Sequence, residues 1–128
     1  MKKYLFLITS FLTALVASGA TYYVVVGGAG NKDGSSWNNA YANIQDAIDA
    51  ASNDGGGEVC IQNGTYYNSL TMKFNVKIYG GFNGNEKSKD ARSVFSYDVY
   101  KKTPSQISQY ATVIHGGNYR RVINLHYH

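Results

Sequence analysis

The stretch Ile44–Gln62 reads IQDAIDAASNDGGGEVCIQ, and within it the spacing of the apolar residues changes. Before the glycines, apolar residues recur at i, i+3, i+4 and i+7, which predicts one buried helix face over residues 43–52 with Asn43 as the cap. The residues of this face are Ile44, Ala47, Ile48 and Ala51. After the glycines, Val59 and Ile61 alternate with other residues, which predicts a strand.

The flanking segments are typical of short strands joined by glycine turns. The run Thr21–Val26 is β-branched and aromatic and ends at two glycines, and alternating residues recur later in the chain. Val59 and Val76 stand 17 positions apart, close to one coil of a small solenoid. The residues predicted to face inward are Val59, Ile61, Leu70, Met72, Val76 and Ile78. We also expect Trp37 and Tyr41 to seat the helix.

These observations predict an all-β fold, a right-handed parallel β-helix (β-solenoid). The single helix would close the open end of the stack, because stacked parallel coils leave unpaired backbone groups at each end. On this interpretation the chain holds about three coils, near the minimum for a stacked core, and is expected to be part of a longer protein.

Several short blocks, taken in order, resemble the N-terminal region of secreted pectin-lyase-like right-handed parallel β-helix proteins. The resemblance covers roughly residues 22–86 and is carried by Asp33–Trp37, Ala40-Tyr41, Ile44–Ala51, Gly57–Val59, Gly64–Tyr66, Val76–Phe82 and Gly84–Glu86. It implies the fold more strongly than an activity, because this scaffold carries lyases, hydrolases and adhesins. The family's calcium ligands and basic catalytic residue lie on later coils, so the resemblance implies no catalytic residue here.

The first 20 residues have the order of a secretory signal peptide. Two lysines precede an apolar run, Leu5–Ala17, and small residues follow it. That run is shorter than the about 20 residues that cross a bilayer, so we predict no transmembrane segment in the mature chain. The predicted organisation is a signal peptide over 1–20 and the cap and first coils over 21–128, in a secreted, periplasmic or cell-surface protein.

Charge and cysteine content restrict the possible partners. The formal net charge is +4, and two of the lysines that contribute to it lie in the leader, so we predict no nucleic-acid partner. Cys60 is the single cysteine, which excludes an intramolecular disulfide. We interpret it as a small apolar residue.

Candidate contact residues gather in a polar, tyrosine-rich part of the chain. They are Tyr97, Tyr100, Tyr110 and Tyr119, with the basic residues Lys101, Lys102, Arg120 and Arg121. Sugar rings stack on aromatic faces, and basic side chains pair with uronate carboxylates, so these residues predict contact with polysaccharide or a surface partner. The alternative is that the tyrosines only cover the coils.

Two short motifs offer metal ligands. Asn31 and Asp33 present oxygen atoms at alternate positions, as calcium loops do, but the bidentate Glu of an EF-hand is missing and a turn is the alternative. His126 and His128 would share one strand face with Asn124 and could bind zinc or copper, or form a polar chain end. We predict no cofactor, with calcium as the alternative.

The predicted function is that of an exported surface segment which is not catalytic by itself and contacts polysaccharide or cell-surface proteins. The alternative is the N-terminal part of a polysaccharide lyase or glycoside hydrolase whose catalytic coils lie beyond residue 128. Self-association is a further expectation, because an open C-terminal coil exposes an unpaired strand edge.

Overall fold

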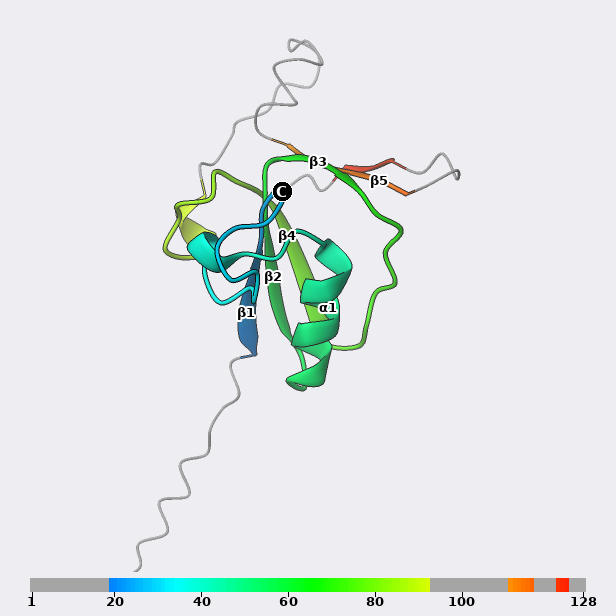
Figure 1. Cartoon of the computed structure of the whole chain (residues 1–128). Helices are drawn as coiled ribbons and strands as arrows, with labels where there is room; N and C mark the ends of the chain where they lie inside the picture. Colours follow the sequence, from blue (N-terminus) through cyan, green and yellow to red (C-terminus); the bar gives the residue numbers. More distant parts are fainter. Residues whose placement is uncertain (1–18, 93–110, 117–121, 125–128) are drawn as a thin grey trace, which may run out of the picture.

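The computed structural model describes residues 19–92, 111–116 and 122–124, in which six strands form two three-stranded sheets (Figure 1). The strands are β1 (Ala20–Val24), β2 (Gly57–Gln62), β3 (Gly64–Tyr67), β4 (Val76–Phe82), β5 (Thr112–His115) and β6 (Val122–Asn124). One α-helix, α1 (Ile44–Asn53), and two short 3₁₀ turns, η1 (Trp37–Asn39) and η2 (Lys89–Ala91), complete the described elements. The sheet orders are β1-β2-β4 and β3-β5-β6.

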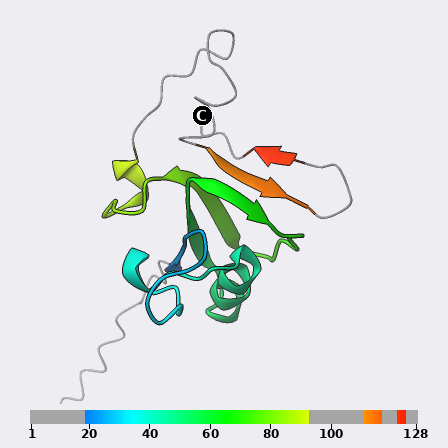
Figure 2. The same ribbon diagram turned by 45° about the horizontal axis from the view of Figure 1, so that its top comes forward.

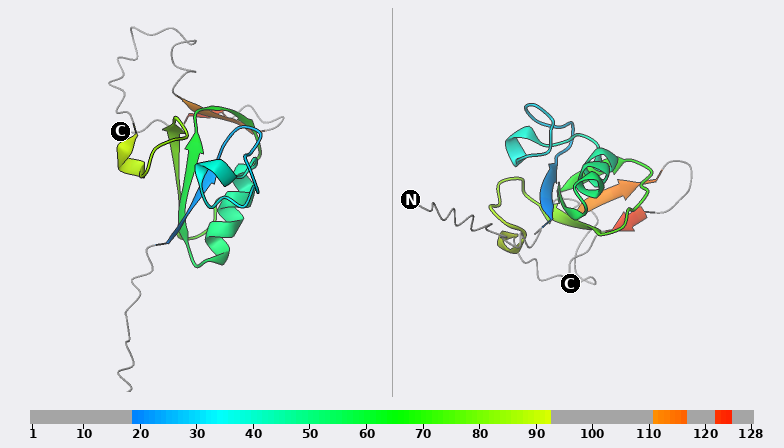
Figure 3. Two further views of the ribbon diagram at one scale, coloured as in Figure 1. Left: turned by 60° about the vertical axis from the view of Figure 1, so that its left-hand side comes forward. Right: turned by 90° about the horizontal axis from the view of Figure 1, so that it is seen from below.

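The first sheet is parallel throughout and carries α1 on one face. Parallel neighbours need a crossover connection, and α1 lies in the connection from β1 to β2. In Figure 3 the sheet lies between α1 on one side and the η2 segment on the other. Within the described residues, none of the helices has the length and apolar content needed to cross a membrane.

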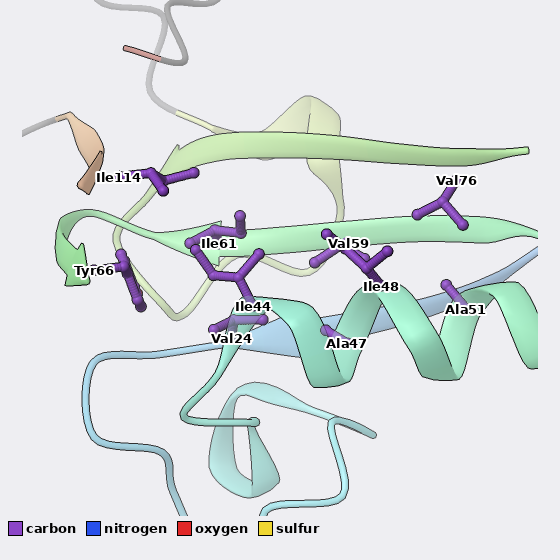
Figure 4. Packing of buried hydrophobic residues seen from close by; sticks show 10 residues of the cluster. All are labelled: Val24, Ile44, Ala47, Ile48, Ala51, Val59, Ile61, Tyr66, Val76 and Ile114. Carbon is purple, nitrogen blue, oxygen red and sulfur yellow. The ribbon is translucent and has the colours of Figure 1, made fainter. Parts of the chain in front are cut away.

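The predicted helix is confirmed together with its cap. Its four predicted apolar residues are fully buried against the sheet (Figure 4). The Asn43 side-chain oxygen accepts the backbone N–H of Gln45 at 2.8 Å. At the other end, the N–H groups of Gly55 and Gly56 bond to the carbonyls of Ser52 and Ala51, with Gly55 at φ +87°, which is a Schellman motif.

The prediction of a β-helix is wrong for the residues that the structure describes. Instead of stacked coils there are two small sheets and one helix, and the second sheet ends in an antiparallel pair, β5 with β6. The helix lies along a face of the first sheet rather than across the end of a stack. Val59 pairs with Ile78 and not with Val76, because alternation specifies the face of a strand but not its partner.

Half of the predicted interior residues are buried. Val59, Ile61 and Val76 belong to the core, and Leu70 and Ile78 pack against it while partly exposed. The prediction for Met72 is wrong, since 54% of this residue is exposed.

Met72 is exposed because the segment around it is not a strand. The Gln45 side chain of α1 binds the backbone of Thr71 on both sides, accepting its N–H at 2.8 Å and donating to its carbonyl at 3.1 Å. These two hydrogen bonds hold the segment against the end of α1. Its alternating pattern therefore does not lead to sheet pairing.

A buried hydroxyl joins the two sheets. β3 follows β2 almost directly, and it pairs in parallel with β5 (Figure 2). Thr112 of β5 is fully buried, and its Oγ1 accepts the N–H of Gly81 at 2.9 Å and donates to the carbonyl of Gln62 at 3.0 Å. The hydroxyl thus connects β5 to β4 and to the end of β2.

Candidate functional site

The face of the first sheet opposite α1, here called the far face, carries polar and aromatic residues of all three strands. Neighbouring positions across the sheet place Tyr23 beside Cys60 and Cys60 beside Tyr79. Because side chains alternate, these three residues point away from the core residues next to them, such as Val59. The far face therefore has a different chemistry from the core face of the same strands.

A hollow of about 230 Å³ lies on the far face. Its lining residues are Thr21, Tyr23, Glu58, Cys60, Phe82 and the segment Glu86–Asp90. Pockets for drug-sized ligands measure roughly 300–1,000 Å³, so this hollow suits a single ring or a group of similar size.

An aromatic cluster includes two residues that line the hollow, Tyr23 and Phe82. The ring of Trp37 lies 4.7 Å from that of Tyr23 and 5.3 Å from that of Phe82. Its indole N–H donates to the carbonyl of Glu86 at 2.8 Å. The prediction that Trp37 seats the helix is therefore wrong, whereas Tyr41 does pack against the core beneath α1.

The segment Glu86–Arg92, here called the wall, is fastened to β4. The Arg92 guanidinium lies 4.8 Å from the centre of the Phe82 ring and 5.3 Å from that of Tyr79. It also donates to the carbonyl of Gly80 at 2.9 Å. Together with the Trp37 bond to Glu86, this contact holds the wall near both of its ends.

The Glu86 carboxylate closes the turn that leads into the wall. It accepts the backbone N–H groups of Asn83, Gly84 and Asn85 at 2.7–3.0 Å. Burial acts to raise the pKa of Glu86, but these hydrogen bonds outweigh it, so the pKa is lowered. Glu86 is thus an ionised structural group.

Cys60, which lines the hollow, is a poor nucleophile. Cys60 is 2% exposed, and burial, followed by the nearby charge of Glu58, raises its pKa to about 11. Since the thiolate is the nucleophile, a thiol that stays protonated at neutral pH is a poor one. This environment agrees with the interpretation of Cys60 as a small apolar residue.

An ion pair lies at the edge of the hollow. Lys89 Nζ lies 2.7 Å from Oε1 of Glu58, and the Tyr79 hydroxyl donates to the same oxygen at 3.4 Å. The hydrogen bond to Glu58 raises the pKa of Lys89. Within the described part of the chain, Oε2 of Glu58 and the hydroxyls of Thr21 and Tyr23 make no hydrogen bond, so all three can serve a ligand.

A second candidate surface lies on the other sheet. The rings of Tyr67 and His115 are stacked, with centroids 5.2 Å apart and planes inclined by 13°. Tyr67 is 79% exposed, while the neighbouring residues on the two strands, Tyr66 and Ile114, are buried. Tyr67 and His115 therefore lie on the outward face of β3 and β5. We call Tyr67 and His115 the aromatic pair.

The predicted contact and histidine residues lie outside the described residues. These are Tyr97, Tyr100, Tyr110, Tyr119, Lys101, Lys102, Arg120, Arg121, His126 and His128. Their roles stay predictions, as does self-association through the C-terminal end.

The Asp33 carboxylate stabilises a turn through hydrogen bonds. Its Oδ1 accepts the backbone N–H of Ser35 at 2.9 Å and the Ser35 hydroxyl at 2.6 Å, and these hydrogen bonds lower the pKa of Asp33. Asn31 contributes its backbone N–H to the side chain of Asn39. Among the residues that the structure describes, no three His, Cys, Asp or Glu side chains gather in a way that could hold a metal ion.

Sequence reasoning missed both candidate surfaces. Tyr23 and its neighbour Val24 lie on opposite faces of the first strand, but the run Thr21–Val26 gives no sign of which face is buried, and no local pattern linked Glu58 to Lys89. No protein-family model, curated protein or solved structure matches the chain, so nothing in these comparisons identifies the pectin-lyase-like family. The chemistry of the two surfaces is therefore the basis for assigning a function.

Proposed function

We propose that this chain is an exported, non-catalytic protein that contacts polysaccharide through the aromatic pair. The observation that carries the proposal is the stacking of an exposed Tyr67 on His115 at 5.2 Å. A sugar ring has an apolar C–H face that packs on an aromatic ring, and a tyrosine held parallel to a neighbouring ring loses little freedom on binding. Thr65 shares this strand face and adds a hydroxyl for hydrogen bonding.

The state of the ionisable groups around the hollow favours binding over catalysis. Glycoside hydrolysis uses a pair of carboxyl groups, one of which is kept protonated by a raised pKa. Glu86 has the opposite shift, and Glu58 is paired with Lys89. Cys60 is unsuited to nucleophilic attack because its pKa is raised.

The leader supports export. Residues 1–20 carry the basic, apolar and small-residue order of a signal peptide, so the proposal places the protein in a secreted, periplasmic or cell-surface location. A cell-surface protein is the alternative partner.

Affinity electrophoresis of the exported protein in gels containing neutral or uronate polysaccharides tests the proposal. We expect at least one polysaccharide to retard the wild type, and Tyr67→Ala to weaken that binding by about three- to tenfold, since the stacking contact is removed. Phe74→Ala is the matched control, because Phe74 is 95% exposed but belongs to the connection between β3 and β4.

Polysaccharide contact would be rejected if the wild type ran unretarded in every gel, or if Tyr67→Ala behaved like the wild type. Capture of the protein only by a protease-sensitive cell-surface fraction would point to the alternative partner.

A further inference from the structure

We propose that the hollow on the far face is a separate binding site for a neutral sugar ring, such as the end or a branch of a glycan. The hollow lies on the first sheet and the aromatic pair on the second, so this site does not require contact at Tyr67. Its volume of about 230 Å³ limits the ligand to about one ring.

The aromatic lining of the hollow suits the apolar face of a sugar. Tyr23 lines the hollow with a partly buried ring, and Trp37 packs against that ring. Phe82 also lines it but is only 1% exposed, so it supports the hollow without offering a free face. Arg92 lies over Phe82 at 4.8 Å and holds that ring in place. The Tyr23 ring, held by Trp37, offers a stacking surface at little further entropic cost.

The lining also offers polar groups that nothing in the described chain uses. The hydroxyls of Thr21 and Tyr23 can each donate and accept, and Oε2 of Glu58 can accept. A sugar ring has several hydroxyls around a rigid frame, so it can meet donors and acceptors at the edge while its C–H face rests on Tyr23. A purely apolar ligand would leave the hydroxyls of the site without partners.

The charge of the lining points to a neutral ligand. Three acidic residues, Glu58, Glu86 and Asp90, face two lysines, Lys87 and Lys89, so the formal charge of the lining is −1. Lys89 is already paired with Glu58 at 2.7 Å. A uronate or phosphate would bring a further negative charge to this lining, which is unfavourable.

The single tryptophan allows a direct test. Trp37 packs on two lining residues and bonds to the wall, so its fluorescence reports on the hollow. The whole exported protein is titrated with the methyl glycosides of glucose, galactose and mannose, and with methyl glucuronide as the charged comparison. We expect a saturable change for at least one neutral glycoside at millimolar concentration, and binding of the glucuronide weaker by about fivefold or more.

Two variants separate a binding role from a structural one. Thr21→Val keeps the side-chain shape and removes one hydroxyl, so we expect the same glycoside to bind about three- to tenfold more weakly. Glu58→Gln is the second variant, used with circular dichroism to confirm folding, and is expected to weaken binding to a similar degree. Tyr67→Ala should leave glycoside binding unchanged.

The inference is overturned by the absence of a saturable change with all three neutral glycosides, by glucuronide binding as tight as theirs, or by full affinity in both folded variants. Loss of polysaccharide binding in Tyr67→Ala with unchanged glycoside binding supports two separate sites. A wild type that binds glycosides but no polysaccharide removes the proposed function and leaves this site standing.

Discussion

The two faces of the first sheet are built from the same three strands but differ in chemistry. The face under α1 presents Val24, Val59 and Ile61, all fully buried, and the helix adds four apolar residues of its own (Figure 4). The far face presents Tyr23 and Cys60 at the intervening positions, beneath a wall that carries charges. Alternation along a strand thus separates a core from a candidate site within one sheet.

The two faces also contribute differently to stability. Aliphatic side chains beneath α1 gain about 25 cal/mol per Å² of apolar surface removed from water. The ion pair of Glu58 with Lys89 on the far face is partly exposed, and such pairs contribute little to folding. The core face is therefore the stabilising one, and the far face is free to serve binding.

The largest expected effect comes from breaking the core face. Ile48→Asp places an unpaired charge in a fully buried position beneath the sheet, which should lower the free energy of unfolding by about 3–5 kcal/mol. Urea unfolding followed by circular dichroism measures it. Asp46→Asn on the exposed side of the same helix should change it by about 0.5 kcal/mol, through the helix dipole alone. Equal stability of Ile48→Asp and the wild type would contradict the packing of α1.

A smaller effect is expected where the two sheets meet. Thr112→Val preserves shape but removes a buried hydroxyl that bonds to Gly81 and Gln62, which should destabilise the fold by about 1–3 kcal/mol. Thr65→Val, at an exposed position of the same sheet, serves as the control and should stay within about 0.5 kcal/mol. If both variants unfold at the same urea concentration as the wild type, the hydroxyl does not join the sheets.

The smallest effect concerns alkaline pH. The Tyr22 hydroxyl donates to Asp54, and this hydrogen bond, together with burial and the Asp54 charge, raises the pKa of Tyr22 from 10.0 to about 12. The resulting stabilisation is present below about pH 10 and is lost as the pH rises through about 12. Between about pH 10 and pH 12, the free energy of unfolding of Tyr22→Phe should therefore fall less than that of the wild type. At pH 8 the two free energies of unfolding should differ by less than about 1 kcal/mol. Parallel alkaline unfolding profiles for the two proteins would show that the bond contributes nothing.

Local signals predicted the elements well and their assembly poorly. The helix over 43–52 is found at Ile44–Asn53, and the strand expected at Thr21–Val26 is found at Ala20–Val24. The prediction for Trp37 failed because its partners come from β1, β4 and the wall, which are remote in sequence.

The sequence by itself determined where the helix begins and ends and that Val59 and Ile61 of β2 share a face, because periodicity and capping act over a few neighbouring residues. Only the tertiary structure decided that Val59 pairs with Ile78, that the second sheet closes with an antiparallel strand, and that Lys89 meets Glu58. These contacts join residues far apart in the chain, and a repeating pattern of two is compatible with many pairings of the same strands.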